Sequence, residues 1–149
     1  MNEKVIDEIK KSYDLIYDAN DQMFHIWIEH VLFTWRWWFG VLLAIVPWII
    51  WILYRKREST SRLMFAGVFS MLVAIWLDFI GIAYGKWFYK SEVLPFLPAY
   101  VPWDFCLIPV SIMFLIQYKP AFSPFIKALI FAGLTACVAE PFFHWIELY

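Results

Sequence analysis

The sequence is poor in charge: only 17% of its 149 residues are Asp, Glu, Lys or Arg, whereas 63% are hydrophobic and 22% are aromatic. A chain this short cannot hide so many apolar side chains in a core of its own, because small domains leave a large share of their surface exposed. The composition excludes an ordinary soluble domain and leaves lipid as the solvent for the remaining apolar surface. We therefore expect a single membrane domain over residues 1–149.

Features that mark several common function classes are also absent. The two cysteines, Cys106 and Cys137, lie in apolar runs and are predicted to be small buried side chains, although a disulfide stays open. The formal net charge is −1, and no cluster of Lys and Arg favours nucleic acid as a partner. No nucleotide-binding loop, Ser-His-Asp set or Cys-rich metal motif is present, which removes most enzyme classes. The charged residues 1–24 do not have the apolar centre of a cleavable signal peptide.

Four segments are apolar for long enough to cross a bilayer, which takes about 20 residues. They are predicted over residues 31–54, 62–84, 101–118 and 124–144. The predicted fold class is therefore all-α, an integral membrane four-helix bundle. Residues 1–30 form either an amphipathic N-terminal helix or a helical extension of the first span, because Val5, Ile9 and Ile16 recur at helical spacing on one side.

Positive charge near the span ends predicts the orientation, because Lys and Arg are enriched on the cytoplasmic side. The first connection carries Arg55, Lys56, Arg57 and Arg62, and the third is flanked by Lys119 and Lys127. The second connection has only Lys86 and Lys90. We therefore predict a multi-pass membrane protein with both termini outside.

Ionisable side chains inside the spans gather toward one membrane face. Each such group costs at least about 2.5 kcal/mol within a span, so each needs a partner or a task. In an up-and-down bundle the span ends that carry them fall at the same face, which the charge pattern makes the outer one. We predict a ligand-binding polar pocket there, lined by His25, Glu29, Arg36, Asp78, Trp87, Asp104, Glu140 and His144.

Helical phase, at 100° per residue, places small or polar side chains on one face of the spans. If the helix runs unbroken into the first span, Arg36 shares a face with Asp14, Asp18, His25 and Glu29. The corresponding face of the second span holds Gly67, Ala74, Asp78, Gly81 and Gly85. That of the fourth span holds Gly133, Ala136, Glu140, His144 and Glu147. These faces are expected to point inward.

Two carboxylate–imidazole pairs are candidate metal ligands: His25 with Glu29, and Glu140 with His144. The Glu-x-x-His spacing of di-metal carboxylate bundles is absent, so a hydrogen-bonded network without metal is the favoured interpretation. A haem held by His144 and either His25 or His30 stays open, but nothing in the sequence selects it, and no cofactor is expected.

Arg36 and the tryptophans near the span ends each have a structural and a functional interpretation. Arg36 is either an interfacial anchor or a partner of Asp78 or Glu140. The tryptophans near the outer span ends fit an interfacial belt better than a stacking pocket for a ring-bearing ligand.

Residues 77–117 carry a recognisable pattern, in which an acidic residue and glycines end one span, G-x-W-x-[YF] follows, and the next span opens with Pro-x-acid. The residues concerned are Asp78, Gly81, Gly85, Trp87, Tyr89, Pro102 and Asp104. The pattern resembles lycopene cyclase-type membrane domains, in which adjacent glutamates stand where this chain has the single Asp104. The resemblance implies protonation of a polyene or isoprenoid, with Asp104 as the acid beside Asp78 and Glu140. The whole chain resembles more closely small four-span proteins of spore-forming Gram-positive bacteria. This resemblance implies a bacterial plasma membrane but no particular activity.

Two function classes follow from these observations. The first is binding of a hydrophobic or lipid-like ligand in the polar pocket, as a sensor or accessory subunit. The second is a membrane enzyme doing acid–base or metal-assisted chemistry on an isoprenoid or lipid, with Asp104, Asp78 and Glu140 as candidate catalytic residues. The expected partners are membrane lipids, a hydrophobic small molecule, and a second copy or another membrane protein.

Overall fold

The computed structural model describes residues 2–118 and 120–148, which are helical apart from connecting turns and one long loop and contain no β-strand. The long helices are α1 (Glu3–His30), α2 (Trp35–Tyr54) and α3 (Thr60–Ala83). The shorter ones are α4 (Ile108–Gln117), α5 (Pro124–Leu134) and α6 (Glu140–Trp145). A 3₁₀ turn, η1 (Arg57–Ser59), and two π-helical segments, η2 (Pro102–Leu107) and η3 (Thr135–Ala139), complete the described part. The predicted all-α class is confirmed.

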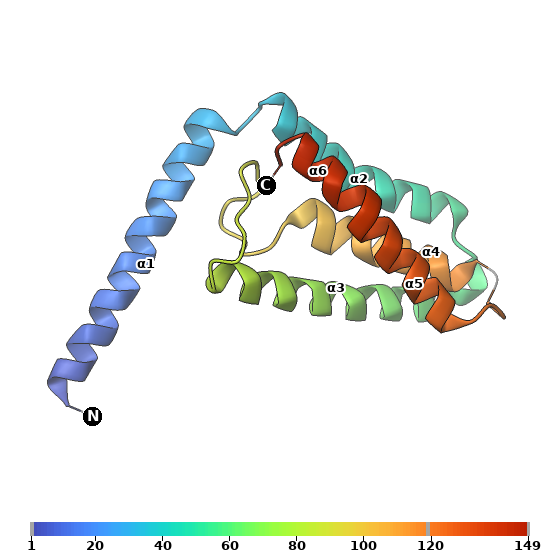
Figure 1. The fold of residues 1–149 in the computed structure, drawn as a ribbon, viewed down its shortest axis with the longest axis horizontal. Helices are drawn as coiled ribbons and strands as arrows, with labels where there is room; N and C mark the ends of the chain where they lie inside the picture. Colours follow the sequence, from blue (N-terminus) through green and yellow to red (C-terminus); the bar gives the residue numbers. More distant parts are fainter. Residues whose placement is uncertain (1, 119, 149) are drawn as a thin grey trace.

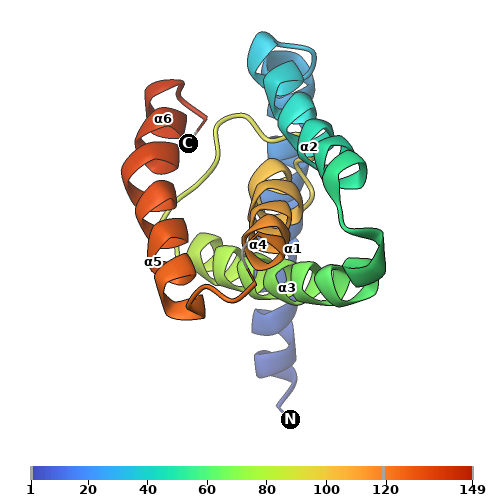
Figure 2. The same cartoon turned by 90° about the vertical axis from the view of Figure 1, so that its right-hand side faces the viewer.

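Three helical stretches are long and apolar enough to cross a membrane: Trp35–Tyr54, Arg57–Ala83 and Pro124–Trp145. In the last of these, α5, η3 and α6 follow one another as a single rod. A fourth apolar stretch, Pro102–Gln117, joins η2 to α4 and is shorter. These four rods are inclined to one another in Figure 1, where α5–α6 is the most oblique to α3. Figure 2 shows α4 above α3, with α2 on one side and α5–α6 on the other.

Helix α1 is separate from α2, so the alternative of a helical extension of the first span is wrong. The chain turns at residues 31–34, where Phe33 takes a left-handed backbone conformation with φ of 61°. Thr34 then caps α2 by accepting a hydrogen bond from the Trp37 N–H at 3.3 Å. All of α1 is solvent-exposed apart from the half-buried Trp27, and the helix runs across the direction of the rods (Figure 1).

The closest helix pair is α3 with α4, because small residues on α3 let the two backbones approach. Gly67 faces Met113 of α4 so closely that an added Cβ would stand 2.8 Å from the Met113 sulfur. Leu63, Met113 and Val110 bury their side chains here together with Trp51 of α2. The core of the molecule therefore lies among α2, α3 and α4.

The rod of α5, η3 and α6 is attached differently. No residue of α5 or η3 is buried, and neither α5 nor α6 makes an extended backbone contact with α2, α3 or α4. Its C-terminal end is held by side chains: the Phe143 ring meets Trp103 edge-on at 5.2 Å, and Leu148 is buried against Tyr100. The rod thus stands against the core mainly at one end.

Candidate functional site

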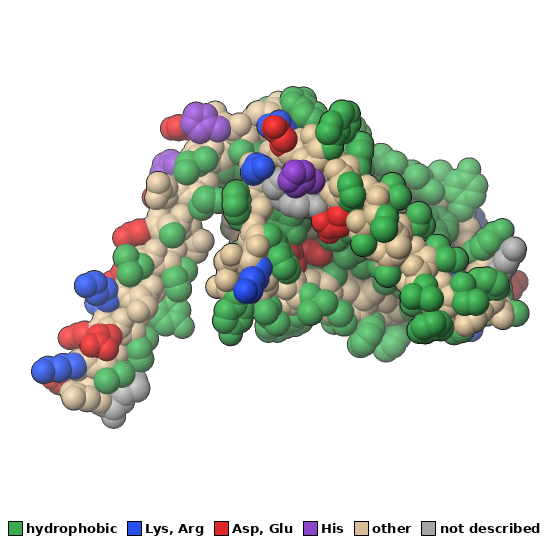
Figure 3. Space-filling view, in the orientation of Figure 1, with side chains coloured by type: hydrophobic (Ala, Val, Ile, Leu, Met, Phe, Trp, Pro, Cys, Tyr) green, Lys and Arg blue, Asp and Glu red, His purple; other side chains and the backbone are tan. Residues whose placement is uncertain are grey.

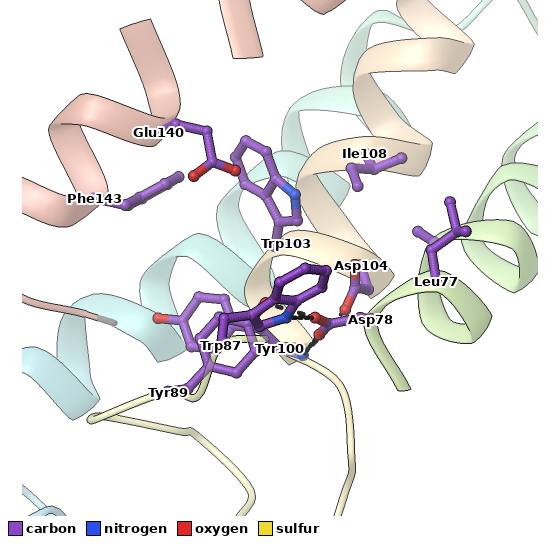
Figure 4. A pocket seen from close by; sticks show the side chains of 11 residues that line it. Leu77, Asp78, Trp87, Tyr89, Tyr100, Trp103, Asp104, Ile108, Glu140 and Phe143 are labelled. Atoms are coloured by element: carbon purple, nitrogen blue, oxygen red, sulfur yellow. Dashed lines mark hydrogen bonds between the residues drawn. The ribbon is translucent and has the colours of Figure 1, made fainter. Parts of the chain in front are cut away.

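A cavity of about 450 Å³ lies at this end of the molecule, between α3, η2, α4 and α6. Its volume is within the range of small-molecule sites, about 300–1,000 Å³. The lining is mostly apolar and aromatic, and Figure 4 shows the side chains converging from three helical rods and the long loop. The lining residues are Ala74, Leu77, Asp78, Trp87, Tyr89, Tyr100, Trp103, Asp104, Ile108, Glu140 and Phe143.

Asp78, near the end of α3, is the centre of the polar part of this cavity. Its carboxylate is buried and accepts three hydrogen bonds: from Trp87 Nε1 at 2.6 Å, from the Tyr89 hydroxyl at 2.8 Å and from the Tyr100 N–H at 2.9 Å. Three donors to one carboxylate stabilise its negative charge and replace the water it has lost. All three come from the loop that follows α3, so Asp78 also fixes the path of that loop (Figure 4).

Asp104 lies close to Asp78, because both carboxylates accept a hydrogen bond from the same backbone N–H. It is 2% exposed and lies in the first turn of η2, where its carboxylate accepts the same Tyr100 N–H at 3.0 Å. Tyr100 lies two residues before η2 begins, so the Asp104 side chain reaches back over the start of the helix to accept this N–H. The shared N–H brings two carboxyl groups together in a largely apolar surrounding.

Two glycines let the loop fold back over α3. Gly85 has φ of +63°, a left-handed conformation that glycine adopts without a steric cost. Trp87 then lies against Gly81, where an added Cβ would stand only 1.9 Å from the indole ring. The ring can therefore reach Asp78 only because residue 81 has no side chain.

The far side of the loop is held by the rest of the molecule. Trp27 Nε1 of α1 donates to the Glu92 carbonyl at 2.8 Å, and Trp37 Nε1 of α2 donates to the Val93 carbonyl at 3.2 Å. Near the C-terminal end of the described chain, the Leu148 carbonyl accepts the Lys90 N–H at 3.0 Å. The loop thus joins α1, α2 and the region after α6 around one end of the cavity.

Burial changes the acid–base behaviour of the loop side chains. Loss of water, followed by the charge of Asp78, raises the pKa of Glu92 to about 8. Burial, together with the neighbouring Asp78 carboxylate, raises the pKa of Tyr89 well above its usual range, so the hydroxyl keeps its proton and remains a donor. The same loss of water raises the pKa of Tyr100.

Four of the eight side chains predicted to line a pocket do line this cavity: Asp78, Trp87, Asp104 and Glu140. Arg36 instead pairs with Glu147 and not with Asp78 or Glu140. His25 and Glu29 are exposed on α1, where His25 lies 3.7 Å from Asp21 and Glu29 lies 3.8 Å from His30. His144 is exposed on α6 and is not among the lining residues.

The predicted shared face of His25, Glu29 and Arg36 does not exist, because the turn at residues 31–34 breaks the helix between them. No group of three or more His, Cys, Asp and Glu side chains able to hold a metal ion occurs among the described residues. The two candidate metal pairs lie on different helices, α1 and α6. Both cysteines are free thiols; Cys106 is buried as expected, but Cys137 is exposed.

The pocket predicted from the sequence did not include three of the aromatic lining residues, Tyr100, Trp103 and Phe143. Pro102 favours a helix start, and an acidic residue two positions later would meet the unpaired N–H groups there. This signal could have indicated that Asp104 bonds to the backbone at the start of η2, but it does not single out Tyr100.

Comparison with known proteins adds no relative: no family model, curated protein or solved structure matches the chain. The site is therefore interpreted from its own geometry.

Proposed function

We propose that the four rods cross a bilayer as a bundle and that the cavity lies at its outer face. The basic residues support this orientation, because Arg55, Lys56, Arg57 and Lys127 all lie at the opposite end of the rods, as cytoplasmic positive charge does in membrane proteins. Both termini then lie outside. The stretch Pro102–Gln117 is too short to cross the bilayer by itself. In this proposal the loop before it occupies the rest of the bilayer thickness on the outer side.

In this arrangement α1 lies along the outer surface of the bilayer. Its charged side chains project from the side that faces away from the bundle, and its apolar side chains face the side where lipid would be (Figure 3). Val5, Ile9 and Ile16 are all exposed in the isolated chain, which agrees with a partner made of lipid.

The function that the geometry supports best is binding of an amphiphilic, lipid-like ligand. The observation that carries it is the cavity of about 450 Å³, apolar and aromatic over most of its wall but with carboxyl groups gathered in it. Such a site buries a hydrocarbon body and orients it through a few polar contacts. We infer that a ligand would enter from the lipid beside the α5–α6 rod, because α5 and α6 make few backbone contacts with the core.

The test is retention of a ligand by a variant with a filled cavity. Ala74 is buried and lines the cavity, so Ala74→Phe places a ring inside it. Ala132 of α5 is exposed, and Ala132→Phe is the matched control. Mass spectrometry of molecules extracted from protein purified in lipid nanodiscs should find one amphiphile enriched over bulk lipid in the wild-type protein and in Ala132→Phe, and lost in Ala74→Phe.

Two outcomes would contradict the binding function. Equal retention by Ala74→Phe would place the ligand elsewhere on the protein. A wild-type protein with no enriched molecule, which also fails to take up any added amphiphile, would remove the binding function itself.

A second candidate, acid–base catalysis on an isoprenoid or lipid, is favoured by the contact between Asp104 and Asp78. Two carboxyl groups that share one N–H donor can hold a single proton between them, and such pairs serve as acids in other enzymes. Incubation with isoprenoids in deuterated water should then give a product that contains deuterium with the wild-type protein and none with Asp104→Asn. An unchanged isoprenoid pool with the wild-type protein would exclude this candidate for the substrates tested.

A further inference from the structure

The end of the rods opposite the cavity is strongly basic. At this end α2 and α4 finish and α3 and α5 begin (Figure 1). Its basic residues lie on the connection from α2 to α3 and in the first turns of α3 and α5: Arg55, Lys56, Arg57, Arg62 and Lys127. Glu58 is the single acidic residue in the described part of this end. Positive charge here exceeds the negative charge that the protein places beside it.

These basic side chains are not compensated by carboxylates. In the part of the chain that the structure describes, the one arginine with a carboxylate partner is Arg36, which lies at the cavity end and pairs with Glu147. Lys127 donates to the Tyr118 carbonyl at 2.8 Å, which satisfies a donor but does not neutralise the charge. Arg55 differs from its basic neighbours on the connection because it is half-buried, whereas they are exposed.

Arg55 is held in place by an aromatic ring. The central carbon of its guanidinium lies 5.3 Å from the centroid of the Trp51 ring, one turn earlier in α2. Trp51 is 3% exposed and packs with Leu63 and Met113, so its ring is fixed by the core of the molecule. A planar guanidinium stacks on such a ring. The side chain is therefore positioned before any ligand arrives, which lowers the entropic cost of binding.

The stacking fills none of the hydrogen-bond donors of Arg55. Its Nε is buried and has no hydrogen-bond partner in the described part of the chain, and neither terminal amino group donates to an acceptor there. A guanidinium carries five N–H donors and stays charged in proteins. A charge held beside apolar surface without a counter-ion is costly. Arg55 is thus a fixed cation to which the protein supplies no anion.

We propose that Arg55 binds the phosphodiester group of an anionic lipid. A guanidinium can donate two parallel hydrogen bonds to two oxygens of one phosphate. Helix α2 ends at Tyr54, so Arg55 lies where a span meets the headgroups, and basic residues in this position attract the anionic lipids of the cytoplasmic leaflet. The exposed basic neighbours add a less specific attraction. This inference requires the rods to lie in a bilayer, but it does not require a ligand in the cavity.

The test is a lipid titration followed by native mass spectrometry, which separates the protein alone from the protein with one bound lipid. Full-length protein in detergent receives dimyristoyl phosphatidylglycerol or dimyristoyl phosphatidylcholine. The two lipids share their acyl chains and a phosphodiester but differ in net charge. The first phosphatidylglycerol should bind about tenfold more tightly than the first phosphatidylcholine.

Three variants separate Arg55 from the general charge of this end. Arg55→Gln should weaken binding of phosphatidylglycerol about tenfold, because the charged donors are lost. Arg62→Gln removes an exposed positive charge and is the matched control, with an expected loss of about twofold, since exposed charges are screened. Arg55→Lys keeps the charge but loses the planar stack and the paired donors, and should stay about threefold weaker than the wild-type protein. Thermal unfolding without lipid checks that each variant is folded.

Several outcomes would overturn the lipid site. Equal affinities of the wild-type protein for the two lipids would remove it, and so would a loss in Arg55→Gln no larger than that in Arg62→Gln. Inorganic phosphate is the third probe: displacement of phosphatidylglycerol by an equal concentration of phosphate would indicate a site for the free ion and not for a lipid. If Arg55→Gln does not fold, the wild-type comparison and Arg55→Lys decide. The amphiphile in the cavity is tested separately by Ala74→Phe, so either proposal can fail without the other.

Discussion

At one end of the rods two aspartates lie buried beneath a long loop, whereas at the other end short connections leave most ionisable side chains exposed. Polar groups at the exposed end complete helix termini: the Gln117 side chain accepts the Lys56 N–H at 2.8 Å and donates to the Tyr54 carbonyl at 3.0 Å. At the buried end the Asp78 carboxylate accepts three donors; the bonds from Trp87 and Tyr89 are partly buried and the bond from the Tyr100 N–H is buried. Similar hydrogen bonds therefore carry different energetic weight at the two ends, since a buried donor that loses its partner costs more than an exposed one.

Asp78→Ala should have the largest effect, because it leaves the indole of Trp87, the hydroxyl of Tyr89 and the N–H of Tyr100 without their shared acceptor. We expect the free energy of unfolding to fall by about 3 kcal/mol, about 1 kcal/mol for each donor left without an acceptor. Gln117→Ala breaks two bonds at the exposed end and should cost about 1 kcal/mol. Thermal unfolding in one detergent measures both, and equal losses would mean that the ends do not differ.

Two glycines of α3 allow the packing at the two ends of the rods to be compared, because Gly81 lies near the buried aspartates and Gly67 lies nearer the other end. Gly81→Ala drives a Cβ into the rigid Trp87 ring and should destabilise the protein by about 1–3 kcal/mol. Gly67→Ala meets only the flexible Met113 side chain and should cost less. Gly133 has no atom within 4 Å of an added Cβ, so Gly133→Ala measures the gain in helix propensity alone. A Gly81 variant as stable as the Gly67 variant would contradict the contact with Trp87.

The last difference between the two ends concerns the dependence of stability on pH. The pKa of Glu92 is about 8 in the folded protein and 4.5 in its ordinary state, so folding favours the protonated acid. Its contribution to stability is complete below pH 4.5 and is lost as the pH rises through about 8. The melting temperature should therefore fall from pH 5 to pH 9, and Glu92→Gln should flatten this fall, whereas Glu58→Gln at the other end should not. An unchanged slope in Glu92→Gln would show that other groups govern it.

Helical periodicity predicted the site well only where the helix is regular. On α3 the predicted inward residues Gly67, Ala74, Asp78 and Gly81 are all buried, together with Leu63, because nothing interrupts the 3.6-residue repeat between them. Gly85 falls outside this pattern because α3 has already ended. The phase argument was wrong between α1 and α2, where Phe33 turns the chain.

Helical periodicity could not predict the contacts of the loop after α3, because the loop is not helical. Trp87 and Tyr89 bond to Asp78 through a fold-back at Gly85, and Tyr100 contributes its backbone, whose N–H is the same for every residue except proline. Such contacts depend on the path of the chain in space, and the order of residue types specifies that path only weakly. The acidic residues were therefore found from the sequence, but most of their partners were not.

The π-helical turns on both sides of the cavity, η2 and η3, have a consequence for insertions and deletions. A π-helical turn contains one residue more than an α-helical turn and is often found at functional sites. Deleting one residue from η3, for example Ala136, would remove this extra residue and restore an α-helical turn, and α6 would keep its orientation relative to α5. Deleting one residue from the regular helix α5 would instead rotate α6 by about 100° relative to the start of the rod. The two π-helical turns are therefore the places where a rod can lose one residue and still present the same side chains to the cavity.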